Sequence, residues 1–183
     1  MSDEAVAVFT ARSPQRIIRE GGSQAWALDP TRARKCRYLI CVQNQNNPDR
    51  DFSDASEPHG AAYMVCKISD VVPSQDDPGN RWKICISDYA VYPVMDAWKG
   101  WRNPVRYTTL EEMGIDPDKL AFHSVRDEQR KMGVPVDQQQ TQHEALEEQD
   151  NGSIAPLSMA QAKPRLAAYY SVPPAAIEIV IRG

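Results

Sequence analysis

The stretch Arg37-Tyr38-Leu39-Ile40-Cys41-Val42-Gln43 is a nearly continuous apolar run, and the expected fold is built outward from it. A short run of this kind predicts a strand that is covered on both faces. Two longer segments follow, residues 60–72 and 82–91, whose side chains alternate between two sets, as the two faces of a strand require. The link over 73–80 contains Asp77-Pro78-Gly79-Asn80, which is typical of a hairpin turn. These three strands are the expected centre of the fold.

The segments before this centre predict short helices between short strands. Ser13 is a favourable N-cap, Pro14 suits the first helical position, and Gly21 ends the helix. Asp29 before Pro30 repeats the same start signal and opens a short basic turn. The two candidate strands here cover residues 5–9 and 25–28.

The segments after the centre predict one short helix and a closing strand. Thr108-Thr109-Leu110-Glu111 is a capping-box pattern, and Gly114 stops the helix that it starts. Residues 120–125 are the candidate closing strand, and 44–59 is a long polar loop. The sequence lacks the regular alternation of strands and helices that would indicate a parallel α/β fold. The expected class is α+β, with a small, mostly antiparallel β-barrel or curled sheet and short peripheral helices.

The length of 183 residues allows one ordinary domain and a small appendage. We expect the barrel domain over residues 1–129. Residues 130–155 are rich in Gln, Glu and Asp and poor in large apolar groups, which predicts a polar, flexible linker. Residues 156–183 predict a helix followed by an isoleucine-rich strand. A helix and one strand cannot form a core alone, so we expect this tail to dock on the barrel, on a second copy or on a partner.

Composition and charge exclude several classes of protein. The acidic start and the lack of a long apolar run predict a cytoplasmic chain that does not enter a membrane. The four cysteines, Cys36, Cys41, Cys66 and Cys85, have no metal-ligand spacing, so buried free thiols are expected rather than a zinc site. Residues 12–37 carry seven basic residues against two acidic ones, although the net charge of the chain is −4. Arg32, Arg34 and Lys35 are the candidate phosphate contacts, with an ordinary solvated charged face as the alternative.

The segment with the most unusual chemistry is Ala97-Trp98-Lys99-Gly100-Trp101-Arg102-Asn103-Pro104-Val105-Arg106-Tyr107. Aromatic faces beside guanidinium groups suit a planar base attached to a phosphate. The candidate ligand-binding residues are therefore Trp98, Trp101, Arg102, Asn103 and Arg106. The alternatives are aromatic packing at the mouth of the barrel, surface ion pairs of the arginines with nearby carboxylates, and turn chemistry for the asparagine.

Several of these segments resemble PUA-like proteins, notably the EVE and ASCH groups. Residues 37–43, 60–72 and 81–86 are similar to successive strands of those domains. Residues 103–112 look like the family's short connection before its closing strand, and 98–103 echoes the W-x-G-x-R-N run of EVE domains. The resemblance covers about residues 23–125 and implies a PUA-like barrel. Such domains bind RNA, or modified bases in DNA or RNA, often with an extruded base held against aromatic side chains.

Three functions follow as hypotheses. The first is a non-enzymatic nucleic-acid-binding module that takes DNA or RNA, including a modified or flipped base. The second is a protein-interaction factor whose residues 156–183 recruit a partner or form a homodimer, for example by adding a strand to a sheet edge. The third is a nuclease or RNA hydrolase in which Glu57 and His59 form an acid–base pair. Since no nucleotide-cofactor or metalloprotease motif occurs, no cofactor and no metal are expected.

Overall fold

The computed structural model describes residues 4–48, 52–75 and 79–135. The chain divides into two compact units, Met1–Val136 and Asp137–Gly183. The second unit lies outside the described residues, and with it the predicted tail and most of the predicted linker. Within the first unit, the predicted boundary at residue 129 falls inside a helix that continues to Lys131.

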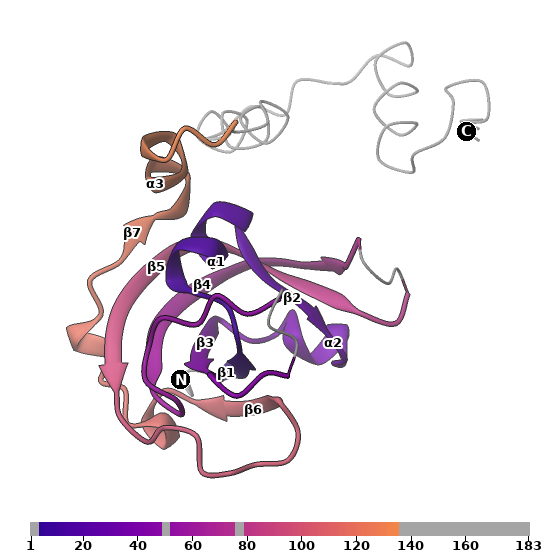
Figure 1. Cartoon of the computed structure of the whole chain (residues 1–183), viewed down its shortest axis with the longest axis vertical. Helices are drawn as coiled ribbons and strands as arrows, with labels where there is room; N and C mark the ends of the chain where they lie inside the picture. Colours follow the sequence, from indigo (N-terminus) through magenta and orange to yellow (C-terminus); the bar gives the residue numbers. More distant parts are fainter. Residues whose placement is uncertain (1–3, 49–51, 76–78, 136–183) are drawn as a thin grey trace, which may run out of the picture. The chain divides into compact units, whose positions relative to one another are not determined.

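The described part of the first unit is a curled mixed sheet with a few short helices, a half-barrel (Figure 1). The strand order is β2-β5-β4-β3-β1-β6, and β7 pairs with β5 beside this path. Figure 1 shows the long strands β4 and β5 bending around β1 and β3, with β6 below them. The strands are β1 (Glu4–Thr10), β2 (Gly22–Trp26), β3 (Tyr38–Gln43), β4 (Ala62–Pro73), β5 (Trp82–Val94), β6 (Val105–Thr109) and β7 (His123–Ser124).

The helices are short and lie outside the sheet path. They are α1 (Pro14–Glu20), α2 (Pro30–Ala33), α3 (Val125–Lys131) and two 3-10 turns, η1 (Glu111–Met113) and η2 (Pro117–Lys119). The predicted start signals are confirmed, because the side chains of Ser13 and Asp29 accept hydrogen bonds from the first backbone N–H groups of α1 and α2. Gly21 ends α1 in the left-handed region at φ 64°. None of the described helices has both the length and the apolar character needed to cross a bilayer.

The two faces of the sheet carry separate apolar clusters, which explains the apolar run at the centre of the fold. All six residues of β3 are buried, as predicted. Leu39 and Cys41 point into the first cluster, with Ile17 of α1, whereas Tyr38 and Ile40 point into the second, with Leu110. Burial on both faces requires apolar side chains at every position of the central strand.

Two predictions about the strands are wrong. Residues 120–125 form only the two-residue strand β7, because the Ser124 hydroxyl accepts a hydrogen bond from the Asp127 N–H at 3.3 Å and starts α3. The last full strand is instead β6, which lies in a segment that the sequence assigned to a connection and a capped helix. The sheet also contains one parallel pair, β1 with β3, made by a crossover through α1, β2 and α2.

Burial of the cysteines leads to a prediction about their reactivity. Cys41 and Cys66 have no exposed surface, and burial raises the pKa of the Cys66 thiol well above its ordinary value. Burial also raises the pKa of Cys85, although Lys83 opposes the shift. A raised pKa leaves less thiolate at a given pH, and the thiolate is the reactive form. We expect iodoacetamide at about pH 8 to label partly exposed Cys85 first.

Mass spectrometry of digested samples measures this order of labelling. A sample labelled in denaturant is the control and should react at all four cysteines. Labelling of Cys41 or Cys66 in the native chain at the rate seen in denaturant would contradict the burial described above.

Candidate aromatic and basic site at the sheet edge

Residues 97–104 of the Trp-rich segment lie in the connection from β5 to β6 across one end of the half-barrel, and residues 105–107 belong to β6 itself. Two backbone hydrogen bonds fix the connection there. The Trp98 N–H donates to the carbonyl of Gly60 at 3.0 Å, and the Phe9 N–H donates to the carbonyl of Pro104 at 2.8 Å. The segment is thus tied to the beginning of β4 and the end of β1.

Trp98 and Trp101 belong to an aromatic stack in which Phe9 is the neighbour that the sequence did not reveal. Phe9 stacks on Trp98 with ring centroids 4.7 Å apart and an angle of 3° between the planes. Trp98 meets Trp101 edge to face at 5.0 Å, and the Arg106 guanidinium lies 4.2 Å from the centre of the Trp101 ring. Both indole rings are half-buried and also pack against the second apolar cluster.

The polar side chains of this segment differ in whether they already form a hydrogen bond or an ion pair within the described residues. The Asn103 side chain accepts a hydrogen bond from the Val105 N–H at 3.1 Å, so it serves the turn before β6. Arg102 is exposed and Arg106 is half-buried, and neither forms an ion pair with a described carboxylate. The Nε atom of Arg106 is buried and has no hydrogen-bond acceptor among the described residues. Within that part of the chain, the predicted surface ion pairs of these arginines are not formed.

The three candidate phosphate contacts separate in the structure. Arg34 turns toward the β4–β5 hairpin, where its guanidinium donates to the Val71 carbonyl at 2.5 Å and lies 3.9 Å from the Asp70 carboxylate. Arg32 turns the other way and lies 4.0 Å from the centre of the Tyr107 ring. Lys35 is exposed. Neither Arg32 nor Lys35 forms an ion pair with a carboxylate in the described ranges, so their charges are available to an external anion.

The edge strand β6 contacts both the aromatic stack, through Arg106, and the candidate phosphate contact Arg32, through Tyr107. On one side β6 pairs with β1, and no other described strand pairs with it. Neighbouring residues of a strand point to opposite faces. Arg106 therefore contacts Trp101 on one face of β6, and Tyr107 contacts Arg32 on the other. The Tyr107 hydroxyl donates to the Asp29 carbonyl at 2.8 Å, which holds the ring in place. Burial raises the pKa of Tyr107, so the hydroxyl stays protonated at neutral pH.

A hollow of about 210 Å³ adjoins the Arg32 side of β6. Its polar lining includes the hydroxyls of Thr108 and Thr109 and the carboxylate of Glu112. The Thr108 hydroxyl donates to Glu112 at 2.6 Å. The edge of β6 thus offers a guanidinium group, two hydroxyl groups and exposed backbone within one small area.

His59 and Glu57 do not form the predicted acid–base pair in the structure. The Gln45 N–H donates to Nδ1 of His59 at 3.2 Å, and Nε2 lies 3.4 Å from the Asn46 side-chain amide. The Glu57 carboxylate accepts from the Ser56 hydroxyl at 3.2 Å. The His59 ring packs edge-on against Phe9, with centroids 5.3 Å apart. His59 therefore links the 44–59 loop to the aromatic stack.

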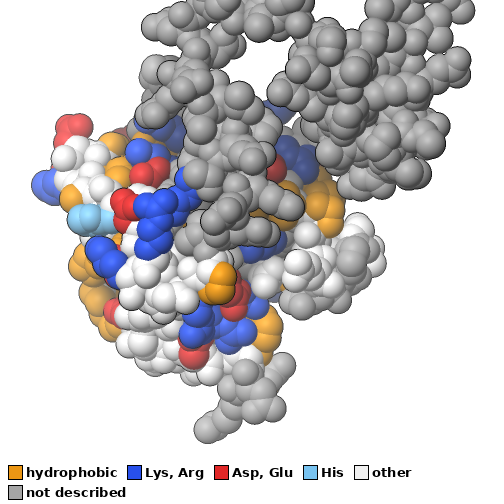
Figure 2. All heavy atoms as spheres, turned by 90° about the horizontal axis from the view of Figure 1, so that it is seen from above, with side chains coloured by type: hydrophobic (Ala, Val, Ile, Leu, Met, Phe, Trp, Pro, Cys, Tyr) orange, Lys and Arg blue, Asp and Glu red, His pale blue; other side chains and the backbone are white. Residues whose placement is uncertain are grey.

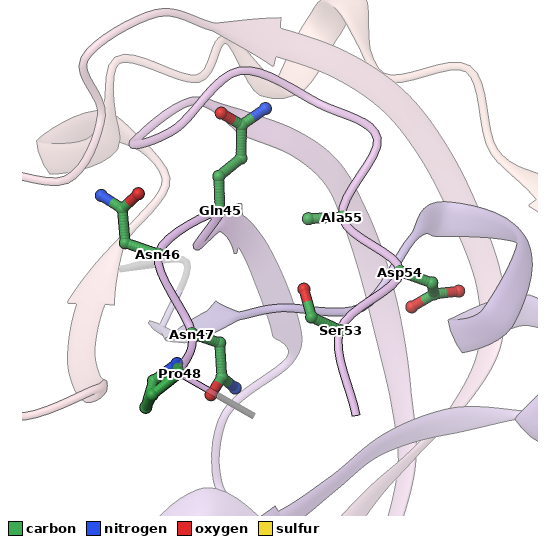
Figure 3. Close-up of a pocket in the computed structure, with 7 residues that line it drawn as sticks. All are labelled: Gln45, Asn46, Asn47, Pro48, Ser53, Asp54 and Ala55. Atoms are coloured by element: carbon green, nitrogen blue, oxygen red, sulfur yellow. The ribbon is translucent and has the colours of Figure 1, made fainter. Parts of the chain in front are cut away.

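Residues 45–48 and 53–55 of that loop line a second, larger hollow of about 900 Å³ (Figure 3). Most of its lining is uncharged: Gln45, Asn46, Asn47, Pro48, Ser53 and Ala55. Figure 3 shows the Ser53 hydroxyl and the Ala55 methyl group pointing into the hollow, whereas the Asp54 carboxylate points away from it. The described residues contain no group of three or more His, Cys, Asp or Glu side chains arranged to hold a metal ion.

Charge on the visible surface is mixed. Figure 2 shows Lys and Arg side chains lying among Asp and Glu side chains on the face it presents. A broad basic patch of the kind that binds polyanions without selection is not seen on the described part of that face. The available cations are instead the individual side chains along β6 and in the loop before it.

No protein-family model, no curated protein and no solved structure matches the chain. The candidate site therefore depends on its own geometry. The sequence pattern indicated Trp98, Trp101, Arg106 and Arg32 as candidates, but it did not indicate Phe9 and Tyr107, which contact Trp98 and Arg32. A signal for Tyr107 was present, since VRYTT alternates as a strand does. Phe9 gave no signal, because its partners lie far away in the sequence.

Proposed function

We propose that this chain is a nucleic-acid-binding module of the PUA-like type, which takes a single strand of DNA or RNA along the edge of β6. The PUA-like part of the proposal is supported by the sequence resemblance and by the curled half-barrel. The strand's phosphates contact Arg32, Lys35 and Arg102, and one of its bases stacks on a half-buried indole ring of Trp98 or Trp101.

One observation carries the proposal. The cations at the β6 edge are without carboxylate partners in the described residues, whereas three exposed cations elsewhere are paired: Lys119 with Asp116, Arg130 with Asp127 and Lys131 with Glu128. Arginine beside an aromatic ring is well suited to a nucleotide, because its planar group both stacks and binds phosphate. Other functions lack an equivalent observation. The interaction tail lies outside the described residues, and both nitrogens of His59 contact the loop.

The test compares two triple variants with the same change in charge. The first is Arg32→Gln with Lys35→Gln and Arg102→Gln, and the matched control is Lys119→Gln with Arg130→Gln and Lys131→Gln. Fluorescence anisotropy measures binding to labelled strands of about ten nucleotides, DNA and RNA separately, from about 50 to 200 mM salt. Each lost phosphate contact should reduce the salt slope by about 0.7, so the first variant should lose about 2 and the control almost nothing.

Two results would contradict the proposal. The first is that the unaltered full-length chain fails to bind either strand at about 50 mM salt, where phosphate contacts are strongest. The second is that the two triple variants lose affinity equally, since this would show a general effect of net charge. A difference between the DNA and RNA arms identifies which nucleic acid is preferred.

A further inference from the structure

The open edge of β6 exposes backbone groups at alternate residues. The Phe9 N–H donates to the carbonyl of Pro104 at 2.8 Å, which makes these two residues a hydrogen-bonded pair at the end of the β1–β6 ladder. Such pairs alternate with non-bonded pairs along an antiparallel ladder. In this register Arg106 and Thr108 direct their backbone groups toward β1. The backbone groups of the residues between and beside them therefore point to the open edge.

These outward backbone groups complement each other. The Val105 N–H already donates to the Asn103 side chain at 3.1 Å. The N–H groups of Tyr107 and Thr109 and the carbonyls of Val105 and Tyr107 have no partner among the described residues. If a second β6 lies antiparallel to the first about a two-fold axis at Tyr107, each Tyr107 N–H meets the other Tyr107 carbonyl. Each Thr109 N–H then meets the Val105 carbonyl of the other copy, so every free donor finds an acceptor.

The same pairing brings opposite charges together. Arg106 lies opposite Thr108 of the second copy, on the same face of the extended sheet. The Thr108 hydroxyl donates to the carboxylate of exposed Glu112 at 2.6 Å, so the Glu112 carboxylate of the second copy lies beside Arg106. Arg106 has a buried Nε without an acceptor in the described part of the chain. Two-fold symmetry repeats this contact on the other side of the axis.

We infer that a second copy of this chain docks on the open edge of β6, with β6 paired antiparallel to β6 and Arg106 of each copy facing Glu112 of the other. β6 is five residues long, so the interface is small. Interfaces under about 1,200 Å² are typical of weak, transient complexes, and the dimer forms only at high concentration. The inference goes beyond the proposed function and does not depend on it. Because both use the same edge, a nucleic-acid strand and the second copy exclude each other.

The experiment changes the charge opposite Arg106 without touching β6. Sedimentation velocity of full-length chains, from about 10 μM to about 1 mM, measures the dissociation constant of the dimer. Glu112→Arg places a like charge beside Arg106 of the other copy. Glu111→Arg is the matched control, because Glu111 is also exposed and belongs to the same turn, η1. A further sample mixes Glu112→Arg with Arg106→Glu, after circular dichroism has shown that both chains are folded.

We expect the unaltered chain and Glu111→Arg to dimerise with similar dissociation constants. Glu112→Arg should raise the constant about tenfold or more, since attraction becomes repulsion at both symmetric contacts. In the mixture each copy again meets opposite charges, so association should return. A monomeric unaltered chain at about 1 mM overturns the inference, and so does equal weakening by Glu112→Arg and Glu111→Arg. Failure of the folded mixture to associate also overturns it. If Arg106→Glu does not fold, the comparison of the two glutamate variants decides alone.

Discussion

Replacing Arg12 with alanine should lower the free energy of unfolding by about 3 kcal/mol, because Arg12 is one of the few charged groups inside the unit. It is 1% exposed and forms an ion pair with Glu20. Its guanidinium also lies 4.6 Å from the centre of the Phe52 ring. The variant leaves a cavity and removes one partner of the half-buried Glu20 carboxylate. The loss stays at the lower end of the usual range because Arg16 still contacts Glu20 at 2.8 Å.

Arg16→Ala is the matched control, since Arg16 shares the same carboxylate but its side chain is 23% exposed. A partly exposed ion pair of this kind contributes about 1 kcal/mol or less. Urea unfolding followed by tryptophan fluorescence measures both variants. The four tryptophans, at 26, 82, 98 and 101, all lie in the first unit, so the signal reports that unit alone. Equal losses in the two variants would mean that the burial of Arg12 has no energetic consequence.

Gly22→Ala should also destabilise the first unit by about 3 kcal/mol, for a different reason. Gly22 begins β2 and pairs with Cys85 of β5. An added Cβ would lie 2.3 Å from the carbonyl oxygen of Ile84 and 3.1 Å from the Cα of Cys85. Both atoms belong to the backbone of the sheet, so neither can move aside without breaking the pairing of β2 with β5.

Gly60→Ala measures the cost of an unfavourable backbone conformation in the absence of a steric clash. Gly60 has φ +78°, which disfavours alanine, but nothing lies within 4 Å of an added Cβ. Strain alone should cost about 1 kcal/mol. The same unfolding experiment compares the two variants. If Gly60→Ala proves as damaging as Gly22→Ala, backbone strain rather than close packing of β2 on β5 would explain both.

The parts of the fold that were predicted correctly depend on residues close together in the sequence. Ser13, Pro14 and Gly21 define α1 because a helix end is satisfied by its own neighbours. The continuous apolar run of β3 predicted burial on both faces, and the alternating patterns of β4 and β5 predicted a hairpin. Residues 97–104 of the Trp-rich segment form a connection, whereas residues 105–107 belong to β6. The aromatic and basic residues of this segment, recognisable from their types and spacing alone, make up most of the candidate site.

The parts that were missed depend on contacts between distant residues. Residues 105–109 become a strand because they pair with β1, about a hundred positions earlier in the chain, and no local signal names that partner. Residues 120–125 look like a strand, but the cap at Ser124 turns most of the segment into a helix start. The parallel pairing of β1 with β3 likewise follows from a crossover, whose direction is set by packing on the sheet.

The sequence by itself determined the helix caps, the buried central strand, the hairpin and the chemical character of the Trp-rich segment. Each of these follows from side-chain periodicity or from hydrogen bonds within a few residues. Only the tertiary structure decided that Phe9 stacks on Trp98, that Arg32 and Arg34 turn in opposite directions, and that β6 carries both groups of the candidate site. Ring stacking and strand pairing join residues that are distant in the sequence, so they exist only once the sheet has curled and brought those residues together.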